Sequence, residues 1–187
     1  TSAGSAEASK TLKFTTVTDS LTGGSGDDTI NGVLQLAAAA DTGTTISPGD
    51  SVTGGTGTDT ISIAVAGKST GDYTLSAVTT NGVEKVLVSN FDTGSKKLEI
   101  DTTLMSGLTT VGASSSSATG TTQFSGLLQN TEAVMRNGSG DLTVSYASSV
   151  VSGSSDTQKL TISNLSAGTF TSDGMETIEV TSDLVKD

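Results

Sequence analysis

The sequence of 187 residues contains no cysteine, no histidine and no tryptophan. Without cysteine and histidine the chain has no disulfides, no thiol redox centre and none of the usual zinc ligand sets. Proline and arginine occur once each, at Pro48 and Arg136. Aromatic residues make up 3% and apolar residues 33%, so a thick globular core is difficult to build from this chain. The abundant glycine, serine and threonine favour short strands that stack closely.

Positive charge is also scarce, with nine basic residues against 20 acidic ones and a net charge of −11. Nucleic acid and anionic membranes are therefore poor partners, and we expect neither. No stretch reaches transmembrane length, so we expect no membrane insertion. Divalent cations would relieve the self-repulsion of so acidic a chain.

The strongest chemical signal is a duplicated segment. Residues 19–30 (DSLTGGSGDDTI) and residues 50–61 (DSVTGGTGTDTI) are identical at nine of twelve positions and are offset by 31 residues. Each copy contains Gly-Gly-x-Gly-x-Asp-x-apolar. Glycine reaches positive φ at little cost, so such a run can turn carbonyl oxygens inward. Calcium takes six to eight oxygen ligands, including carbonyls and carboxylates. The pattern therefore predicts two calcium-binding turns.

The candidate ligands follow from this motif. Asp28 and Asp59 would supply the carboxylate at its sixth position. Asp19 and Asp50, four residues before the first glycine, are either extra ligands or acceptors that hold the turn. The full set of candidate site residues is Asp19, Gly23, Gly24, Gly26, Asp27, Asp28, Asp50, Gly54, Gly55, Gly57 and Asp59.

Two other interpretations of the motif stay open to different degrees. Glycine and aspartate are ordinary β-turn residues, so each copy could be a plain turn between strands. A phosphate-binding loop is less consistent with the sequence, because no Lys-Ser or Lys-Thr follows the glycines and adjacent aspartates repel phosphate.

The rest of the chain predicts short strands. We expect a small-residue arm over residues 1–10 and one β-rich domain over 11–187, with the calcium-loop repeat at 17–66 and Ser/Thr-rich strands at 67–187. Residues 33–40 (VLQLAAAA) are the best helix candidate. Three segments share a turn residue, one further residue, a glutamate and a β-rich run, with the glutamates at Glu84, Glu132 and Glu176. We interpret these glutamates as hydrogen-bond acceptors at strand starts, with a calcium ligand as the alternative.

Short strands separated by Gly, Ser and Asn turns are typical of a stacked β-solenoid or β-helix, in which each turn buries its apolar residues on the next. We therefore expect an all-β fold of this kind, with a β-sandwich as the alternative. Only the ends of such a stack are uncovered, which favours self-association.

These residues resemble calcium-binding RTX-type proteins and, more narrowly, the lattice-forming part of Caulobacter-type bacterial surface-layer proteins. The segments that carry the resemblance are TDSLTGG (18–24), DDTI (27–30), GDSVTGGTGTDTI (49–61) and GVEKV (82–86). The resemblance implies bound Ca²⁺ at Asp28 and Asp59, glycine-shaped loops and assembly into an extracellular lattice on the cell surface. It departs from RTX arrays in one respect: the two copies are not in tandem, so each ion needs further ligands, for which Asp19, Asp27, Asn31, Asp41 and Asp50 are the candidates.

The sequence favours a secreted, non-catalytic structural protein that self-assembles. One alternative is a phage virion surface, fibre or decoration protein. Another is a glycan-binding adhesin or a solenoid enzyme acting on polysaccharide, with cell-surface polysaccharide as the partner. Adjacent residues of a strand point to opposite faces, so Asp27 and Asp28 do not form a converging carboxylate pair, and we expect no enzyme.

Overall fold

The computed structural model describes residues 8–36 and 43–182, and these residues form sixteen β-strands and no helix. Every strand pairing among them is parallel, which confirms the all-β prediction. In the part of the chain covered by these two ranges, no helix is long and apolar enough to cross a membrane.

The strands lie in three sheets. The largest has eight strands, in the order β1 (Thr11–Lys13), β3 (Thr29–Leu36), β5 (Thr60–Gly67), β8 (Lys85–Asn90), β10 (Thr110–Ser114), β12 (Glu132–Gly138), β14 (Thr157–Leu165) and β16 (Thr177–Ser182). A three-stranded sheet contains β2 (Ser20–Gly24), β4 (Ser51–Gly55) and β7 (Thr79–Asn81). A five-stranded sheet contains β15 (Phe170–Ser172), β13 (Asp141–Tyr146), β11 (Thr121–Leu127), β9 (Leu98–Asp101) and β6 (Tyr73–Leu75).

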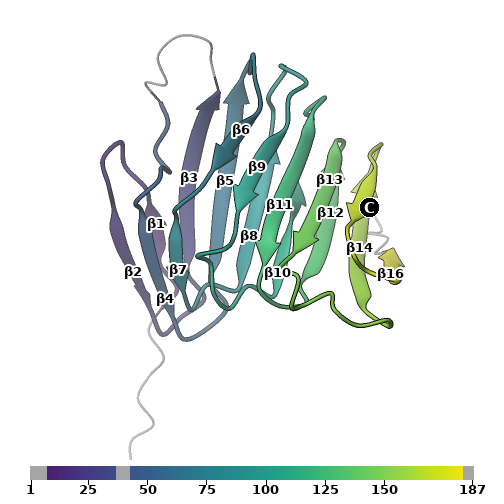
Figure 1. Cartoon of the computed structure of the whole chain (residues 1–187). Coiled ribbons are helices and arrows are strands. Elements are labelled where there is room, and N and C mark those ends of the chain that lie inside the picture. The colour runs from purple at the N-terminus through teal and green to yellow at the C-terminus, as the bar shows by residue number, and fades with distance from the viewer. Residues whose placement is uncertain (1–7, 37–42, 183–187) are drawn as a thin grey trace, which may run out of the picture.

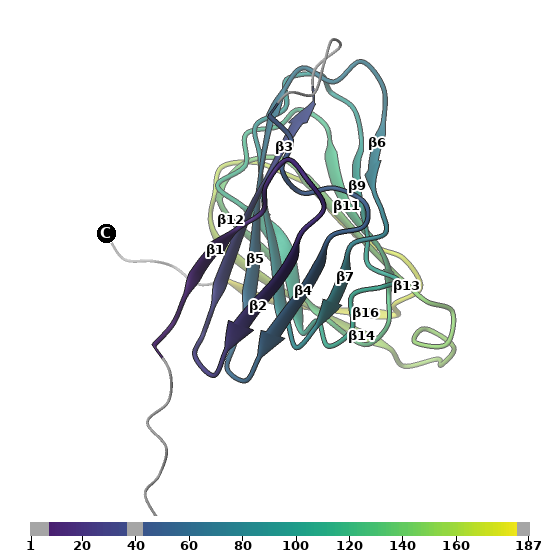
Figure 2. The ribbon, with the colours of Figure 1, turned by 90° about the vertical axis from the view of Figure 1, so that its left-hand side faces the viewer.

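The chain passes repeatedly from one of the smaller sheets to the large sheet. From β1 to β5 it alternates with the three-stranded sheet, between β5 and β8 it passes through β6 of the five-stranded sheet and then β7 of the three-stranded sheet, and from β8 to β16 it alternates with the five-stranded sheet. Each return adds one strand to the large sheet beside the previous one. Figure 1 shows the result as a continuous colour change across the molecule, and Figure 2 turns the N-terminal strands toward the viewer.

The core is built from columns of matching side chains rather than from a few large ones. One column crosses the large sheet through register partners Ile30, Ile61, Val86, Val111, Ala133 and Leu160, all of them buried. Along each strand the next residue points outward, which gives the alternating burial pattern of β3, β5 and β8. Aliphatic side chains therefore fill much of the interior, because each lies on its counterpart in the neighbouring strand.

Two sequence predictions need correction. Val33–Leu36 belong to strand β3 and not to a helix, because Leu34 and Leu36 alternate into the core and pair with β5; residues 37–40 of that helix prediction lie outside the described ranges. Glu132 is not equivalent to Glu84, since Thr110 pairs with both Lys85 and Glu132. In the sheet, Glu132 therefore occupies the position of Lys85, one residue after that of Glu84.

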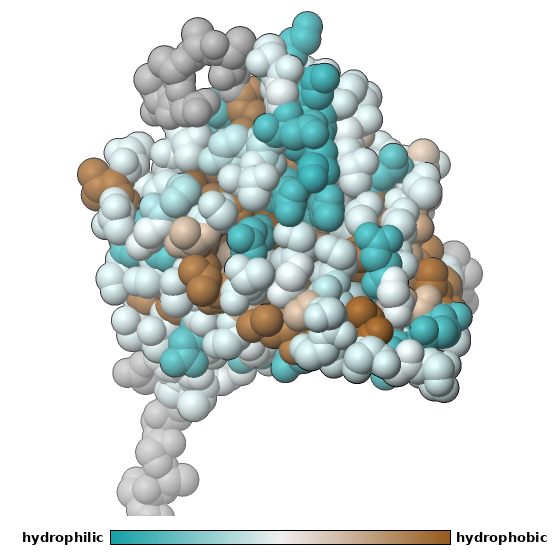
Figure 3. Space-filling model, viewed as in Figure 1, coloured by the Kyte–Doolittle hydropathy of each residue, from teal (hydrophilic) through white to brown (hydrophobic). Residues whose placement is uncertain are grey.

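The outer surface carries mostly small polar residues. On the face shown in Figure 3, pale and hydrophilic side chains predominate and the hydrophobic ones form separate patches. The larger exposed apolar side chains include Val17, Leu104 and Leu128, and Ile178 and Val180 on β16.

Candidate metal centre

Both glycine-aspartate motifs lie at the passage from the three-stranded sheet to the large sheet. The paired glycines end β2 and β4, and the turns that follow bring Asp28 and Asp59 to the residue before β3 and β5. Thr29 pairs with Thr60, so the two aspartates are neighbours in adjacent strands of the stack. Their exposed fractions are only 1% and 0%.

One oxygen of each carboxylate belongs to a hydrogen-bond ladder along the stack. The Lys10 N–H donates to Oδ1 of Asp28 at 2.6 Å, and the Asp28 N–H donates to Oδ1 of Asp59 at 2.8 Å. The Asp59 N–H then donates to Oε2 of Glu84 at 2.7 Å. Each acid thus binds the backbone of the preceding strand start. Glu176 does the same for the N–H of Asp156 at 2.8 Å, so the interpretation of Glu84 and Glu176 as strand-start acceptors is confirmed.

The second oxygen of each aspartate has no hydrogen-bond partner. Three buried side-chain polar atoms in the described ranges lack one, and two of them are Oδ2 of Asp28 and Oδ2 of Asp59; the third is Oγ1 of Thr80. A buried acceptor without a partner costs about 1–3 kcal/mol, and more when it is charged. Two such atoms in neighbouring strands therefore indicate that a positively charged or proton-donating group is needed.

The glycines bring backbone oxygens close to these two atoms. A Cβ on Gly23 would collide with Oδ2 of Asp28 and with the carbonyl oxygen of Gly54. A Cβ on Gly54 would collide with Oδ2 of Asp59 and with the carbonyl oxygen of Gly82. Each unpartnered oxygen thus lies near a carbonyl oxygen of the following turn, and both atoms carry negative charge density.

Lysine occupies the corresponding position at the start of the stack. Lys10 is the residue before β1, as Asp28 and Asp59 are the residues before β3 and β5, and its backbone N–H belongs to the same hydrogen-bond ladder. Its Nζ donates to the carbonyl oxygen of Gly23 at 2.5 Å. The carbonyl oxygens of Gly23, Gly54 and Gly82 come from equivalent positions of β2, β4 and the residue after β7. An ammonium group therefore lies against the first carbonyl of this row, whereas aspartate oxygens lie near the next two.

The electrostatics of Asp59 agree with this geometry. Burial raises the pKa of its carboxyl above the ordinary value of 3.8, and the charges of Asp28, Glu84 and Asp27 raise it further, against the lowering effect of the Asp28 N–H. A buried carboxylate in this environment is stabilised either by taking up a proton or by binding a cation.

The remaining candidate residues lie elsewhere or have other partners. Asp19 and Asp50 precede β2 and β4, at the opposite end of these five-residue strands from the glycine turns, so they do not converge with Asp28 and Asp59. Asp50 accepts the N–H groups of Asp19 and Ser47 at 2.8 and 2.7 Å. Asp19 likewise accepts the Thr15 N–H at 2.6 Å. The structure thus shows them as acceptors that hold a turn.

Asp27 and the later glycines shape the turns themselves. Oδ1 of Asp27 accepts the Thr58 N–H of the next turn at 2.7 Å. Gly55 and Gly57 have φ of 117° and 124°, where a side chain would be strained, and a Cβ on either would also meet backbone atoms of Gly24 or Gly26. Asn31 lies in β3 on the large sheet, and Asp41 lies outside the described residues.

The donor set fits a cation only in part. Within residues 8–36 and 43–182, no group of three or more His, Cys, Asp or Glu residues could hold a metal ion. A cation beside Asp28 or Asp59 would use one carboxylate oxygen and the carbonyl row, and the rest of the six to eight oxygens that calcium prefers would come from other carbonyls and water.

Lys10 and Gly82 are absent from the site predicted from the sequence. The predicted terminal arm includes Lys10, and Gly82 is a predicted turn residue before Glu84. A signal for Lys10 exists, because Lys10-Thr11-Leu12 repeats the charged-Thr-apolar pattern of Asp28-Thr29-Ile30. No comparable local signal marks Gly82, whose role depends on the pairing of β4 with β7.

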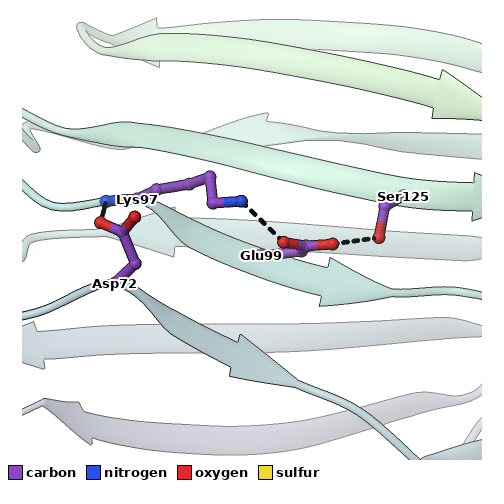
Figure 4. A network of polar contacts seen from close by, with 4 residues as sticks. All are labelled: Asp72, Lys97, Glu99 and Ser125. Carbon is purple, nitrogen blue, oxygen red and sulfur yellow. Dashed lines mark hydrogen bonds and ion pairs between the residues drawn. The ribbon is translucent and has the colours of Figure 1, made fainter.

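A second polar cluster braces the five-stranded sheet. Nζ of Lys97 forms an ion pair with Oε2 of Glu99 at 2.8 Å, and Ser125 Oγ donates to Oε1 of Glu99 at 2.7 Å, as Figure 4 shows. The Lys97 N–H also donates to Asp72 at 3.0 Å. The hydrogen bonds from Lys97 and Ser125 lower the pKa of Glu99. The cluster connects neighbouring strands, as the ladder at Asp28 does.

The outer face of the large sheet has a shallow groove of about 320 Å³. It crosses five strands from β3 to β12 and is lined by Thr29, Thr60, Lys85, Leu87, Thr110, Glu132, Val134 and Arg136. A second hollow of about 340 Å³ adjoins it at Glu132 and extends to Lys159. Three of the nine basic residues of the chain line these two hollows: Lys85, Arg136 and Lys159.

Searches against protein-family models, curated proteins and solved structures gave no match to this chain.

Proposed function

We propose that this protein is a secreted structural protein, a parallel β-solenoid that binds calcium at Asp28 and Asp59 and self-assembles on a cell surface. The observation that carries the proposal is the pair of buried, unpartnered aspartate oxygens that lie near carbonyl oxygens in neighbouring turns. The lysine ammonium on the first carbonyl of the same row supports it, because it shows that a positive charge is accommodated there.

The solenoid interpretation rests on the order of the sheets. Each passage through a smaller sheet returns to the large sheet one strand farther along, and all pairings are parallel. A β-sandwich of the usual kind is built from antiparallel strands joined by hairpins. Parallel pairing of successive turns therefore favours the solenoid.

Calcium would act on folding rather than on chemistry. Asp28 and Asp59 come together only when the turns stack, so the free energy of calcium binding stabilises the folded state. At a hundredfold excess over Kd the stabilisation is about 2.7 kcal/mol per site. Nothing in the geometry of Asp27 and Asp28 favours catalysis, since Asp28 is buried and Asp27 binds the Thr58 N–H. A virion surface protein would use the same properties.

A calcium titration tests this function. Chelator-treated protein is titrated with calcium chloride while the melting temperature and the particle size are measured together. We expect calcium to raise the melting temperature of the native protein. We expect much less of a rise in the Asp28→Asn/Asp59→Asn variant. Asp141→Asn is the matched control, because Asp141 also accepts a strand-start N–H, from Thr169 at 2.8 Å, but has no unpartnered buried oxygen. A melting temperature that does not respond to calcium would refute the metal role.

A second candidate function is adhesion to acidic glycans through the groove on the large sheet. Lys85 and Arg136 line it together with threonine hydroxyls, and these groups suit carboxylated sugars. Binding of acidic and neutral oligosaccharides to the native protein and to Arg136→Gln distinguishes this function. Selective binding of acidic sugars, weakened by Arg136→Gln, would support it, and equal or absent binding would exclude it.

A further inference from the structure

The groove on the outer face of the large sheet contains a trough along β10. The outward positions of β10 hold only small residues, Thr110, Gly112 and Ser114. The strands on either side hold longer side chains at the paired positions. Thr110 pairs with Lys85 and Glu132, Gly112 with Leu87 and Val134, and Ser114 with Arg136. β10 is therefore the floor of the trough, and β8 and β12 are its walls.

The middle of the trough is apolar. Leu87 and Val134 are half-buried and lie on either side of Gly112, with about 9.6 Å, or two strand spacings, between their backbones. A Cβ on Gly112 would collide with the carbonyl oxygen of Val134, so this position must stay without a side chain. Two aliphatic walls above a glycine floor suit the C–H faces of one sugar ring.

One end of the trough carries a positioned cation. Arg136 is exposed and lies two residues beyond Val134 on the same face, roughly 6.6 Å farther along β12. Its Nε donates to Oγ of Ser114 at 3.1 Å, across the floor strand. This contact orients the guanidinium and leaves its two terminal NH₂ groups for an anion, which arginine binds through paired hydrogen bonds.

The other end carries groups of mixed character. Lys85 and Glu132 lie on opposite sides of Thr110. Oε1 of Glu132 accepts the Thr161 hydroxyl at 2.5 Å, which holds this carboxylate toward β14. Within residues 8–36 and 43–182, Lys85 forms no ion pair. An amine, a hydroxyl and a carboxylate together bind sugar hydroxyls, whereas the charge of Glu132 repels an anion. The trough therefore has an anion-binding end and a hydroxyl-binding end.

We propose that this trough is a binding subsite for one hexuronate residue of an acidic polysaccharide, with the ring between Leu87 and Val134 and its carboxylate on Arg136. A hexuronate carries its carboxylate on one side of the ring and hydroxyls on the opposite side, which matches the two ends of the trough. A sulfate ester in place of one of those hydroxyls would lie against Glu132.

The surroundings leave room for the neighbouring sugars. The groove continues past Lys85 to Thr60 and Thr29, and the second hollow extends from Glu132 to Lys159. The inference rests on the glycan-binding candidate function and specifies its ligand; it does not depend on the calcium site.

Calorimetric titration with a hyaluronan hexasaccharide, in which every second sugar is a glucuronate, tests the subsite. We expect the native protein to bind it, and to bind its methyl ester or a dextran sulfate oligosaccharide of matched length about tenfold more weakly or worse. Arg136→Gln should weaken binding by about tenfold or more, because it removes charged hydrogen bonds. Val134→Phe should cause a similar loss without any change of charge, because the phenyl ring fills the trough.

Two variants outside the trough are the matched controls. Lys13→Gln removes one positive charge in the row of Leu87, three strands away from it. Ala64→Phe places a phenyl ring at an exposed position of β5. Both should bind like the native protein. If Val134→Phe lowers the melting temperature, Leu87→Phe fills the trough from the opposite wall and should give the same loss of binding.

The outcomes separate the subsite from glycan binding itself. Native binding that survives both Val134→Phe and Leu87→Phe would overturn the subsite and leave glycan adhesion in place. Equal binding of the methyl ester or of dextran sulfate would overturn the assignment of a carboxylate to Arg136. No binding by the native protein would refute the glycan-binding function together with the subsite, whereas the melting response to calcium tests the metal role independently.

Discussion

The substitution Asp59→Asn should reverse its effect on stability when calcium is added. Oδ1 of Asp59 accepts the Asp28 N–H, and an asparagine carbonyl oxygen can keep that bond. Oδ2 is buried without a partner, and a Cβ on Gly54 would collide both with it and with the carbonyl oxygen of Gly82. We expect an amide NH₂ in its place to donate to that nearby carbonyl oxygen, whereas it would not bind a cation.

The magnitudes follow from these two contacts. In chelator at neutral pH the variant should be more stable than the native protein by about 1–3 kcal/mol, which is the usual cost of a buried unpartnered acceptor. In calcium at a hundredfold excess over Kd, the native protein gains about 2.7 kcal/mol at this site and the variant gains nothing there. For a chain of this size 1 kcal/mol corresponds to about 2–4 °C in melting temperature.

The pH dependence in chelator provides an independent check. The pKa of Asp59 is raised in the folded state, chiefly by burial, so folding favours its protonated form. That stabilisation is complete below the ordinary pKa of the unfolded chain and is lost as the pH rises through the raised folded value. The advantage of Asp59→Asn over the native protein should therefore grow with pH through this window.

The assay is thermal or denaturant unfolding of both proteins over the acidic to neutral range, once in chelator and once in saturating calcium. Asp141→Asn serves as the control for the loss of one charge. Its gain in stability on adding calcium should equal that of the native protein. If Asp59→Asn is more stable than the native protein in both media, or less stable in both, the assignment of Oδ2 to a cation is wrong.

Three further predictions concern the turns and the braces between strands. Gly54→Ala should destabilise the protein by about 1–3 kcal/mol because its Cβ collides with backbone and carboxylate atoms, whereas Gly71→Ala, whose Cβ meets nothing within 4 Å, should be nearly neutral in denaturant unfolding. Asp92→Ala should cost about 1–3 kcal/mol, since it removes the acceptor of a buried N–H at 2.7 Å, and a loss below the error of the measurement would contradict this. Lys97→Met should cost less than about 1 kcal/mol and only at low salt, because the ion pair with Glu99 is partly exposed; the pKa of Glu99 is lowered, so this contribution should disappear as the pH falls through its folded value.

Much of the strand content follows from the sequence. The β-rich runs predicted after Glu84 and Glu176 are strands β8 and β16, and the duplicated glycine-aspartate segments marked the two turns that position Asp28 and Asp59. Local patterns carry this information because a strand and its turn depend on neighbouring residues.

The helix predicted at residues 33–40 shows the limit of such patterns. Val-Leu-Gln-Leu (33–36) begins the predicted helix, but pairing of β3 with β5 along eight residues determines the conformation of this segment. The alignment of Glu132 with Glu84 failed for the same reason, because sheet register depends on which side chains reach the core.

The sequence by itself determined that this protein is an acidic chain of short strands with two repeated glycine turns, because composition and local periodicity decide those properties. Only the tertiary structure decided which groups meet there: Lys10 joins the ladder of Asp28 and Asp59, Gly54 and Gly82 bring their carbonyl oxygens to the aspartates, and Asp19 and Asp50 lie at the far ends of their strands. These contacts join residues 18 to 31 positions apart, and their geometry is fixed by strand register, which no local pattern encodes.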